Sequence, residues 1–224
     1  PRGTMSQVYA HRFIDRVVRC FDYLIDLHTA SFGRVNSLYV RADLKNPITA
    51  RMAYPEGPEI VVHNAGADGT LRSAAAAMGC HAITVEIGDP QRFQRDRIRT
   101  SVQGSFNVLE HLEMVPERGA SLTVDPVICG RSYWIYTDRG GILDVFPEVC
   151  ERVKAGQLIA RVSDIFGDTV REYEAPEDGI VVGKSINPVN QAGSRILHLG
   201  VEGLPPDFPD PGTTHASWPK VGLE

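Results

Sequence analysis

The sequence predicts an α/β sheet in its first half and an all-β part in its second half. Up to about residue 115, short apolar runs rich in β-branched residues alternate with helical patterns, as in an α/β layered sheet. Beyond residue 119, short β-type runs follow one another between glycine-rich turns. We therefore expect an α/β part over residues 1–118, a β domain over residues 119–203 and a proline-rich tail over residues 204–224.

Composition narrows the class of protein. The chain has 224 residues, of which 42% are hydrophobic, enough for one large domain or two modest ones. Its 23 basic and 28 acidic residues are spread along the chain, so no basic stripe indicates nucleic acid as a partner. The four cysteines lie far apart without a CxxC pair, which predicts reduced thiols in a cytoplasmic protein. No apolar run approaches the roughly 18 residues of a membrane helix, so we expect no membrane partner.

The α/β part begins with a helix that Thr4 or Ser6 can cap, because apolar residues recur at helical spacing as far as about Cys20. A strand that ends at His28 follows the helix. The later expected elements are a strand over residues 59–63, a helix over 69–78, a strand over 82–86 and a helix over 96–112, followed by a linker over 114–119.

The second half contains β-type runs over residues 132–136, 158–162 and 179–182. Five prolines follow Leu204, and they prevent regular structure in the tail.

Two apolar runs of the α/β part end in a polar side chain. His28 follows Ile25-Asp26-Leu27, and Glu86 follows Ile83-Thr84-Val85. Ligand sites in open α/β sheets collect at the carboxyl ends of strands, and a neutral imidazole is a common zinc ligand. A carboxylate at the end of a buried strand is typical of a paired or functional group. One imidazole alone does not make a zinc site. The alternative for His28 is therefore a structural histidine in the core.

The segment after His28 can bind an anion. Arg34 offers a planar guanidinium that suits a carboxylate, and Asn36 can donate as well. The alternative is that Arg34 pairs with a surface acid and Asn36 stabilises a turn. Arg72, near the start of the expected helix before Glu86, is a second candidate, with a solvated helix arginine as its alternative. We expect Arg41 to pair with Asp43 or another nearby acid.

These residues together resemble a known family. Asp26-Leu27-His28-Thr29, Gly33-Arg34-Val35-Asn36 and the segment from Gly79 to Gly88 look like the succinylglutamate desuccinylase and aspartoacylase family. The resemblance covers about residues 1–115 and implies a mixed-sheet, zinc-carboxypeptidase-like α/β domain, here partial, before a small all-β domain of barrel-sandwich type.

The same resemblance implies a metal-dependent amidohydrolase, a deacylase of N-acyl amino acids or related small amides with zinc (Zn2+) as cofactor. His28 matches the position of a zinc ligand, and Glu86 matches the catalytic base. Arg34, Asn36 and Arg72 are then the candidates for substrate binding.

The sequence departs from the family at the metal site. The family takes two zinc ligands from an upstream G-x-H-G-x-E segment, and this sequence contains no His-Gly-x-Glu. We expect the chain to be the C-terminal portion of a longer enzyme, to hold zinc weakly by itself and to need an N-terminal segment of the same enzyme as its partner. A homo-oligomer is a further expectation. The alternative is a catalytically inactive homologue that acts as a binding or assembly module.

The β domain adds a second resemblance. Residues 153–160 and 175–181 are similar to the half-barrels of biotinyl and lipoyl carrier domains, which present a modifiable lysine at a hairpin tip. The matching tip, about residues 165–168, has no lysine, so we do not expect a carrier. The β domain is expected to cap an active-site entrance or to mediate oligomer contacts.

Overall fold

The computed structural model describes residues 2–66, 69–117, 125–206 and 208. Its helices are α1 (Met5–Arg16), α2 (Pro47–Ala53), α3 (Leu71–Ala76) and α4 (Arg95–His111), with a 3-10 turn over Val18–Cys20. Its strands are β1 (Tyr23–His28), β2 (Arg34–Asn36), β3 (Tyr39–Ala42), β4 (Ile60–His63), β5 (His81–Glu86), β6 (Val127–Tyr136), β7 (Gly141–Val145), β8 (Arg152–Val153), β9 (Leu158–Ser163), β10 (Thr169–Glu174), β11 (Gly179–Ser185), β12 (Val189–Asn190) and β13 (Arg195–Glu202).

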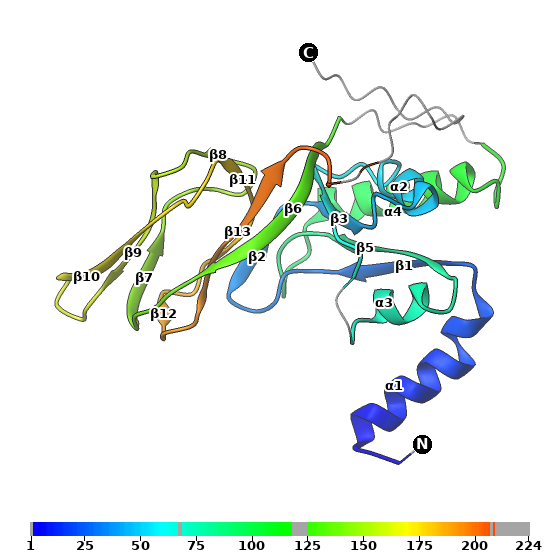
Figure 1. Ribbon diagram of the computed structural model, residues 1–224, viewed down its shortest axis with the longest axis horizontal. Coiled ribbons are helices and arrows are strands. Elements are labelled where there is room, and N and C mark those ends of the chain that lie inside the picture. The colour runs from blue at the N-terminus through cyan, green and yellow to red at the C-terminus, as the bar shows by residue number, and fades with distance from the viewer. Residues whose placement is uncertain (1, 67–68, 118–124, 207, 209–224) are drawn as a thin grey trace.

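A nine-stranded mixed sheet joins the two halves of the molecule. Its strand order is β1-β5-β3-β4-β6-β13-β11-β2, and β8 pairs with β11. A second, four-stranded sheet has the order β10-β9-β7-β12 and packs at one end of the molecule (Figure 1). The predicted fold class, a mixed α/β sheet followed by a small β domain, is confirmed.

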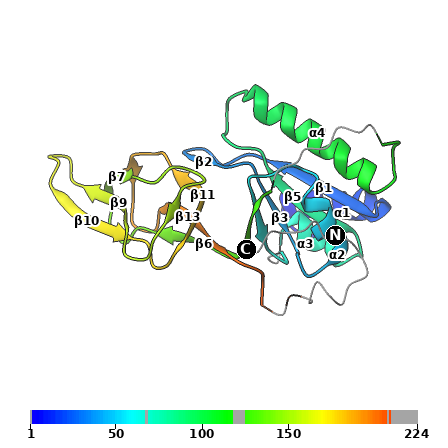
Figure 2. The same cartoon turned by 90° about the horizontal axis from the view of Figure 1, so that it is seen from above.

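Helices cover both faces of the α/β part. On one face, α2 and α4 pack on the apolar side chains of the central strands, among them Val40, Val61 and Ile83. On the other face, α3 packs through Ala75 against Ala82 of β5. Figure 1 shows α2 and α4 on one side of the sheet and α1 and α3 on the other. Figure 2 shows the β domain beside the α/β part along the long axis of the molecule.

Most expected elements are present, with shifted ends. Thr4 caps α1 in a capping box with Gln7, but α1 ends at Arg16, before the 3-10 turn. The hydroxyl of Thr70 accepts a hydrogen bond from the Ser73 amide and starts α3 two residues later than expected. In the segment after His28, residues 34–36 form strand β2, which no expected element covers. The tail after residue 208, and the linker beyond residue 117, lie outside the described residues.

The main sheet curls so that its far end returns to its beginning. Strand β2 pairs with β11, and only Ser37 and Leu38 separate it from β3 in the other half of the sheet. Gly183 of β11 lies opposite Asn36, and a Cβ atom at position 183 would lie 2.3 Å from the Asn36 side-chain oxygen. A glycine at this position therefore permits the close approach of β11 and β2.

Within the part of the chain that the structure describes, no helix is long and apolar enough to cross a membrane.

Candidate active site

Three neighbouring strands bring His28, Glu86 and Tyr39 into one row. Strands β1 and β5 are parallel, and His28 is the register partner of Glu86. Strand β3 runs antiparallel to β5 on its other side, and Tyr39 is also paired with Glu86. Register partners in neighbouring strands project from the same face of a sheet. The two polar strand ends that the sequence indicates are therefore direct neighbours.

A second polar row lies two residues along the same strands. Asp26 of β1 pairs with Thr84 of β5, which pairs with Arg41 of β3. Because side chains alternate along a strand, this row projects from the same face as the first. A charged patch in the middle of a sheet is costly to bury unless its members satisfy one another. The contacts of these residues show that they do.

Glu86 is the buried centre of the site. Its Oε2 accepts a hydrogen bond of 3.3 Å from the side-chain amide of Asn36, and its Oε1 lies 3.6 Å from Nη2 of Arg41. Burial raises the pKa of the Glu86 carboxyl, and the nearby cations and the Asn36 amide offset only part of that effect. Glu86 is thus a carboxylate with increased proton affinity, held in place from two sides.

Tyr39 and Arg41 fix the floor of the site. Tyr39 is fully buried, and its hydroxyl oxygen accepts a hydrogen bond of 3.1 Å from Arg41 Nε and a second from Arg41 Nη2. Burial raises the pKa of Tyr39 above its ordinary value of 10, so the phenol stays protonated even in alkaline solution. Arg41 therefore contacts both Glu86 and Tyr39. The sequence predicts an acidic partner for Arg41, Asp43 or another nearby acid, and in the structure that partner is Glu86.

His28 lies at the open side of the row. Its imidazole is 50% exposed, and Nε2 lies 2.9 Å from Oδ2 of Asp26. A carboxylate on one ring nitrogen orients a histidine so that the other nitrogen can bind a metal. The Nδ1 atom of His28 makes no hydrogen bond with the described residues, so His28 fits the role of one zinc donor.

A complete zinc site needs more donors than His28. The described residues contain no group of three or more His, Cys, Asp or Glu side chains placed to hold a metal ion. A catalytic zinc normally takes three protein ligands. His28, with Asp26 on its other ring nitrogen, can therefore supply one donor, and the described residues hold no complete three-ligand zinc site.

The predicted substrate-binding residues separate into three places. Asn36 lies against Glu86. Arg34, two residues earlier on β2, lies over the ring of Trp134 with its guanidinium carbon 5.6 Å from the ring centroid. Arg72 is buried in α3 and donates to the backbone oxygen and the side-chain oxygen of Asn64. The alternative of a solvated arginine at position 72 is therefore wrong.

Sequence reasoning missed the part that Tyr39 and Arg41 play in the site. Both are polar positions of one strand, two residues apart, so they share a face. That signal could have marked them as a pair. Their position beside Glu86 depends on the antiparallel pairing of β3 with β5, which no local pattern indicates.

A mixed α/β sheet with an imidazole and a buried carboxylate at adjoining strand ends is typical of an α/β protein whose candidate ligand site lies at the strand ends. Residues 2–112 match the family model described as the succinylglutamate desuccinylase/aspartoacylase catalytic domain. Through these residues, the chain belongs to the succinylglutamate desuccinylase/aspartoacylase family, a family of deacylases. Zinc dependence is general in this family.

Relatives of known name or structure resemble most of the chain. The N-alpha-acetyl-L-2,4-diaminobutyric acid deacetylase of Halomonas elongata is 22% identical over an alignment of 197 residues that covers 82% of this chain and 57% of that protein. The product-bound ectoine utilization protein EutE of Ruegeria pomeroyi has a TM-score of 0.77 at 19% identity, covering 90% of this chain and 64% of that one.

A succinylglutamate desuccinylase/aspartoacylase of Rhodobacter sphaeroides has a TM-score of 0.76 at 22% identity, covering 91% of this chain and 65% of that one. At these identities the solved structures establish the fold. The chain spans less than two thirds of the length of each of these three relatives.

Proposed function

We propose that the chain supplies the zinc-ligand histidine, His28, and the general base, Glu86, of a deacylase. The whole protein would hydrolyse the amide bond of an N-acyl amino acid or a related small amide. The observation that carries this proposal is the pairing of His28 with Glu86 at the ends of two parallel strands. The matched protein of Halomonas elongata is named a deacetylase of an N-acetylated amino acid, and this supports the proposed substrate class.

Glu86 suits the role of general base because of its surroundings. The pKa of the Glu86 carboxyl is raised towards neutral pH. A general base is most effective when its pKa lies near the working pH. Asn36 and Arg41 fix the carboxylate, so it does not have to reorganise when it accepts a proton. We propose that Glu86 takes the proton of the attacking water and returns it to the leaving amine.

His28 suits the role of metal donor, with Asp26 as the carboxylate that orients its ring. Zinc, when bound, lowers the pKa of a water towards about 7 and polarises the acyl carbonyl. We propose that the other zinc ligands come from an N-terminal segment of the same enzyme. This proposal rests on the family resemblance, in which two zinc ligands come from an upstream segment.

Asn36 and Arg34 are the proposed substrate ligands on the chain. Both belong to β2, and Asn36 is already in contact with the proposed base. Arg72 is left out of the proposed substrate site, because two hydrogen bonds to Asn64 occupy its guanidinium.

The test uses the whole protein, purified with zinc and assayed against N-acetyl and N-succinyl amino acids. Glu86→Gln keeps the shape of the side chain but removes its basicity, so we expect turnover to fall by at least about 100-fold while the zinc content stays unchanged. His28→Ala is expected to lower the zinc content itself. Glu56→Gln is the matched control, because Glu56 is also buried but lies at the contact between the α2 end and α4.

Retained turnover in Glu86→Gln would remove Glu86 from the mechanism. A whole protein that neither retains zinc nor cleaves any of these amides would overturn the deacylase proposal and favour the alternative, a binding or assembly module.

A further inference from the structure

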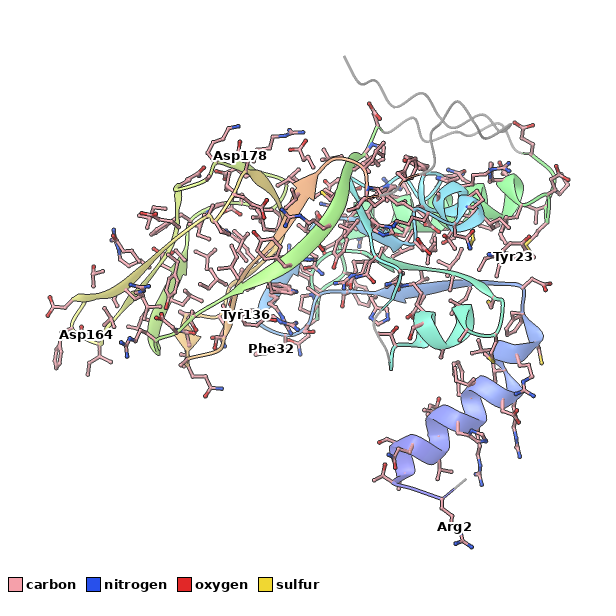
Figure 3. All side chains as sticks on the ribbon, viewed as in Figure 1. Arg2, Tyr23, Phe32, Tyr136, Asp164 and Asp178 are labelled. Carbon is pink, nitrogen blue, oxygen red and sulfur yellow. The ribbon has the colours of Figure 1, made fainter. Side chains whose placement is uncertain are left out.

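A cavity lies where the α/β part meets the β domain. Its volume is about 150 Å³, and its walls come from the α/β part, including Phe32 before β2 and Arg34 of β2, and from the β domain, including Asn187 and Arg195. Figure 3 labels Phe32 and Tyr136, which mark this junction at the beginning of β2 and the end of β6. The cavity therefore depends on both parts of the molecule.

Positive charge dominates the cavity. Arg34 and Arg195 both line it, and none of its lining residues is an Asp or Glu. Neither arginine makes an ion pair within the described residues. Burial lowers the pKa of Arg34, and the nearby charge of Arg195 lowers it further, while Tyr136 and Glu86 offset part of this effect.

A single aromatic ring positions both guanidinium groups. The Arg34 and Arg195 guanidinium carbons lie 5.6 Å and 5.0 Å from the centroid of the Trp134 ring. The indole stacks on His198 with ring centroids 5.0 Å apart and planes 13° apart. His198 is buried, and its Nε2 pairs with the Ser132 hydroxyl at 2.9 Å. The indole is thus a fixed support for two cations.

The histidine below the indole adds no charge of its own. Burial, and after it the charges of Arg41 and Arg195, lower the pKa of His198 to about 3, so the ring is neutral at physiological pH. The positive charge of the cavity is therefore that of Arg34 and Arg195.

Asn187, a polar residue that also lines the cavity, offers a further hydrogen-bond donor. The side-chain oxygen of Asn187 accepts a hydrogen bond of 3.2 Å from the Val189 amide, so the NH2 group of Asn187 is left to donate. Gly33 has a φ of 75° and approaches Asn187 so closely that a Cβ atom at position 33 would lie 3.1 Å from the Asn187 Cβ. This close packing holds the Arg34 segment against the β domain.

We propose that this cavity binds a small carboxylate, and that Arg195 of the β domain and Arg34 of the α/β part bind it together. Each planar guanidinium can donate two parallel hydrogen bonds to a carboxylate, and an anion between them relieves their mutual repulsion. The cavity volume suits a carboxylate with a short chain. Arg195 then makes the β domain a part of the ligand site as well as a cover for it.

This inference deepens the proposed function, and it rests on that function for one source of the ligand, the carboxylate of an N-acyl amino acid. A free dicarboxylate such as succinate is the other source. Binding itself requires no turnover, so the two proposals can fail separately.

The test is a titration of the 224-residue chain with succinate, acetate and an N-acetyl amino acid, at constant ionic strength set with sodium chloride. Calorimetry measures the affinity. Tryptophan fluorescence locates the ligand, because the sequence holds only Trp134 and Trp218, and a Trp218→Phe background leaves Trp134 as the reporter. We expect saturable binding with a matching change in Trp134 emission. The tighter of succinate and the N-acetyl amino acid identifies the source of the carboxylate.

Variants identify the contacts. Arg195→Gln and Arg34→Gln are each expected to weaken binding at least ten-fold. Arg195→Lys keeps the charge but loses the planar donor pair, so we expect an intermediate affinity. Arg171→Gln is the matched control, because Arg171 also lies over an aromatic ring, that of Tyr173, but pairs with Asp138. Circular dichroism verifies that each variant is folded.

Three results would overturn the inference: no binding beyond that of chloride, binding without a change in Trp134 emission, or equal effects of Arg195→Gln and Arg171→Gln. If the whole protein turns over amides but the cavity fails these tests, the inference falls and the proposed function stands. If the cavity binds carboxylates but the whole protein lacks turnover, the proposed function falls and the inference about the cavity stands.

Discussion

At the scale of single residues, Glu56 is a costly group to bury in the α/β part. Its side chain is fully buried, and neither carboxyl oxygen has a hydrogen-bond partner among the described residues. Burial raises its pKa from the ordinary 4.5 to about 8, and the nearby Ser105 hydroxyl offsets only part of the rise. Between these two pH values the folded chain therefore holds a proton that the unfolded chain has released.

This difference gives stability a pH dependence of known sign. A raised carboxyl pKa means that the folded state binds more protons than the unfolded state, so stability falls as pH rises from about 4.5 to about 8. Glu56→Gln keeps the shape without the titration, so we expect it to be more stable than the wild type at pH 8.5, on the order of 3 kcal/mol. At pH 4.5 the difference should vanish. Urea unfolding at both pH values measures it, with exposed Glu174→Gln as the control. An equal gain at both pH values would contradict the account.

At the scale of elements, α4 packs so closely on the segment after α2 that only glycine fits at position 104. A Cβ atom there would lie 2.4 Å from the backbone oxygen of Glu56. Alanine favours a helix over glycine by about 1 kcal/mol, but this clash has to move backbone. We expect Gly104→Ala to lower the free energy of unfolding by about 2 kcal/mol.

The control for this prediction lies on the same helix. Val102 is 54% exposed, so Val102→Ala should change the free energy of unfolding by no more than about 0.5 kcal/mol. Chemical denaturation measures both variants. A stabilising effect of Gly104→Ala would show that α4 and the α2 end are farther apart than described.

Elements also show what the sequence could predict. Strands β1, β4 and β5 are short, mainly apolar runs, and β4 and β5 are rich in β-branched residues, so local pattern sufficed to place them and the polar groups at two of their ends. Strand β2 has three residues, and its partner β11 lies about 150 residues later. A strand this short is defined by its hydrogen bonds to the partner strand, so no local pattern predicts it. The same long-range pairing brings Asn36 to Glu86.

At the scale of the whole molecule, one end of the main sheet is incompletely covered. Strand β1 is the first strand of the sheet and pairs with β5 alone among the described strands. Helix α1, which precedes it, buries none of its residues and leaves Met5 and Tyr9 exposed. In Figure 1, α1 extends away from the rest of the fold. A sheet edge and an apolar helix side in this condition are suited to contact with further protein.

The edge of β1 should make this chain associate with itself when it is studied alone. An unpaired strand edge with apolar side chains pairs with other edges, and a lysine on the edge prevents that pairing. Leu27 is 55% exposed on β1, so we expect Leu27→Lys to weaken self-association of the isolated chain at least ten-fold, measured by sedimentation at a series of concentrations. Ile165→Lys, at an exposed position between β9 and β10, is the control and should leave association unchanged. If Ile165→Lys abolished association and Leu27→Lys did not, the contact would belong to the β domain.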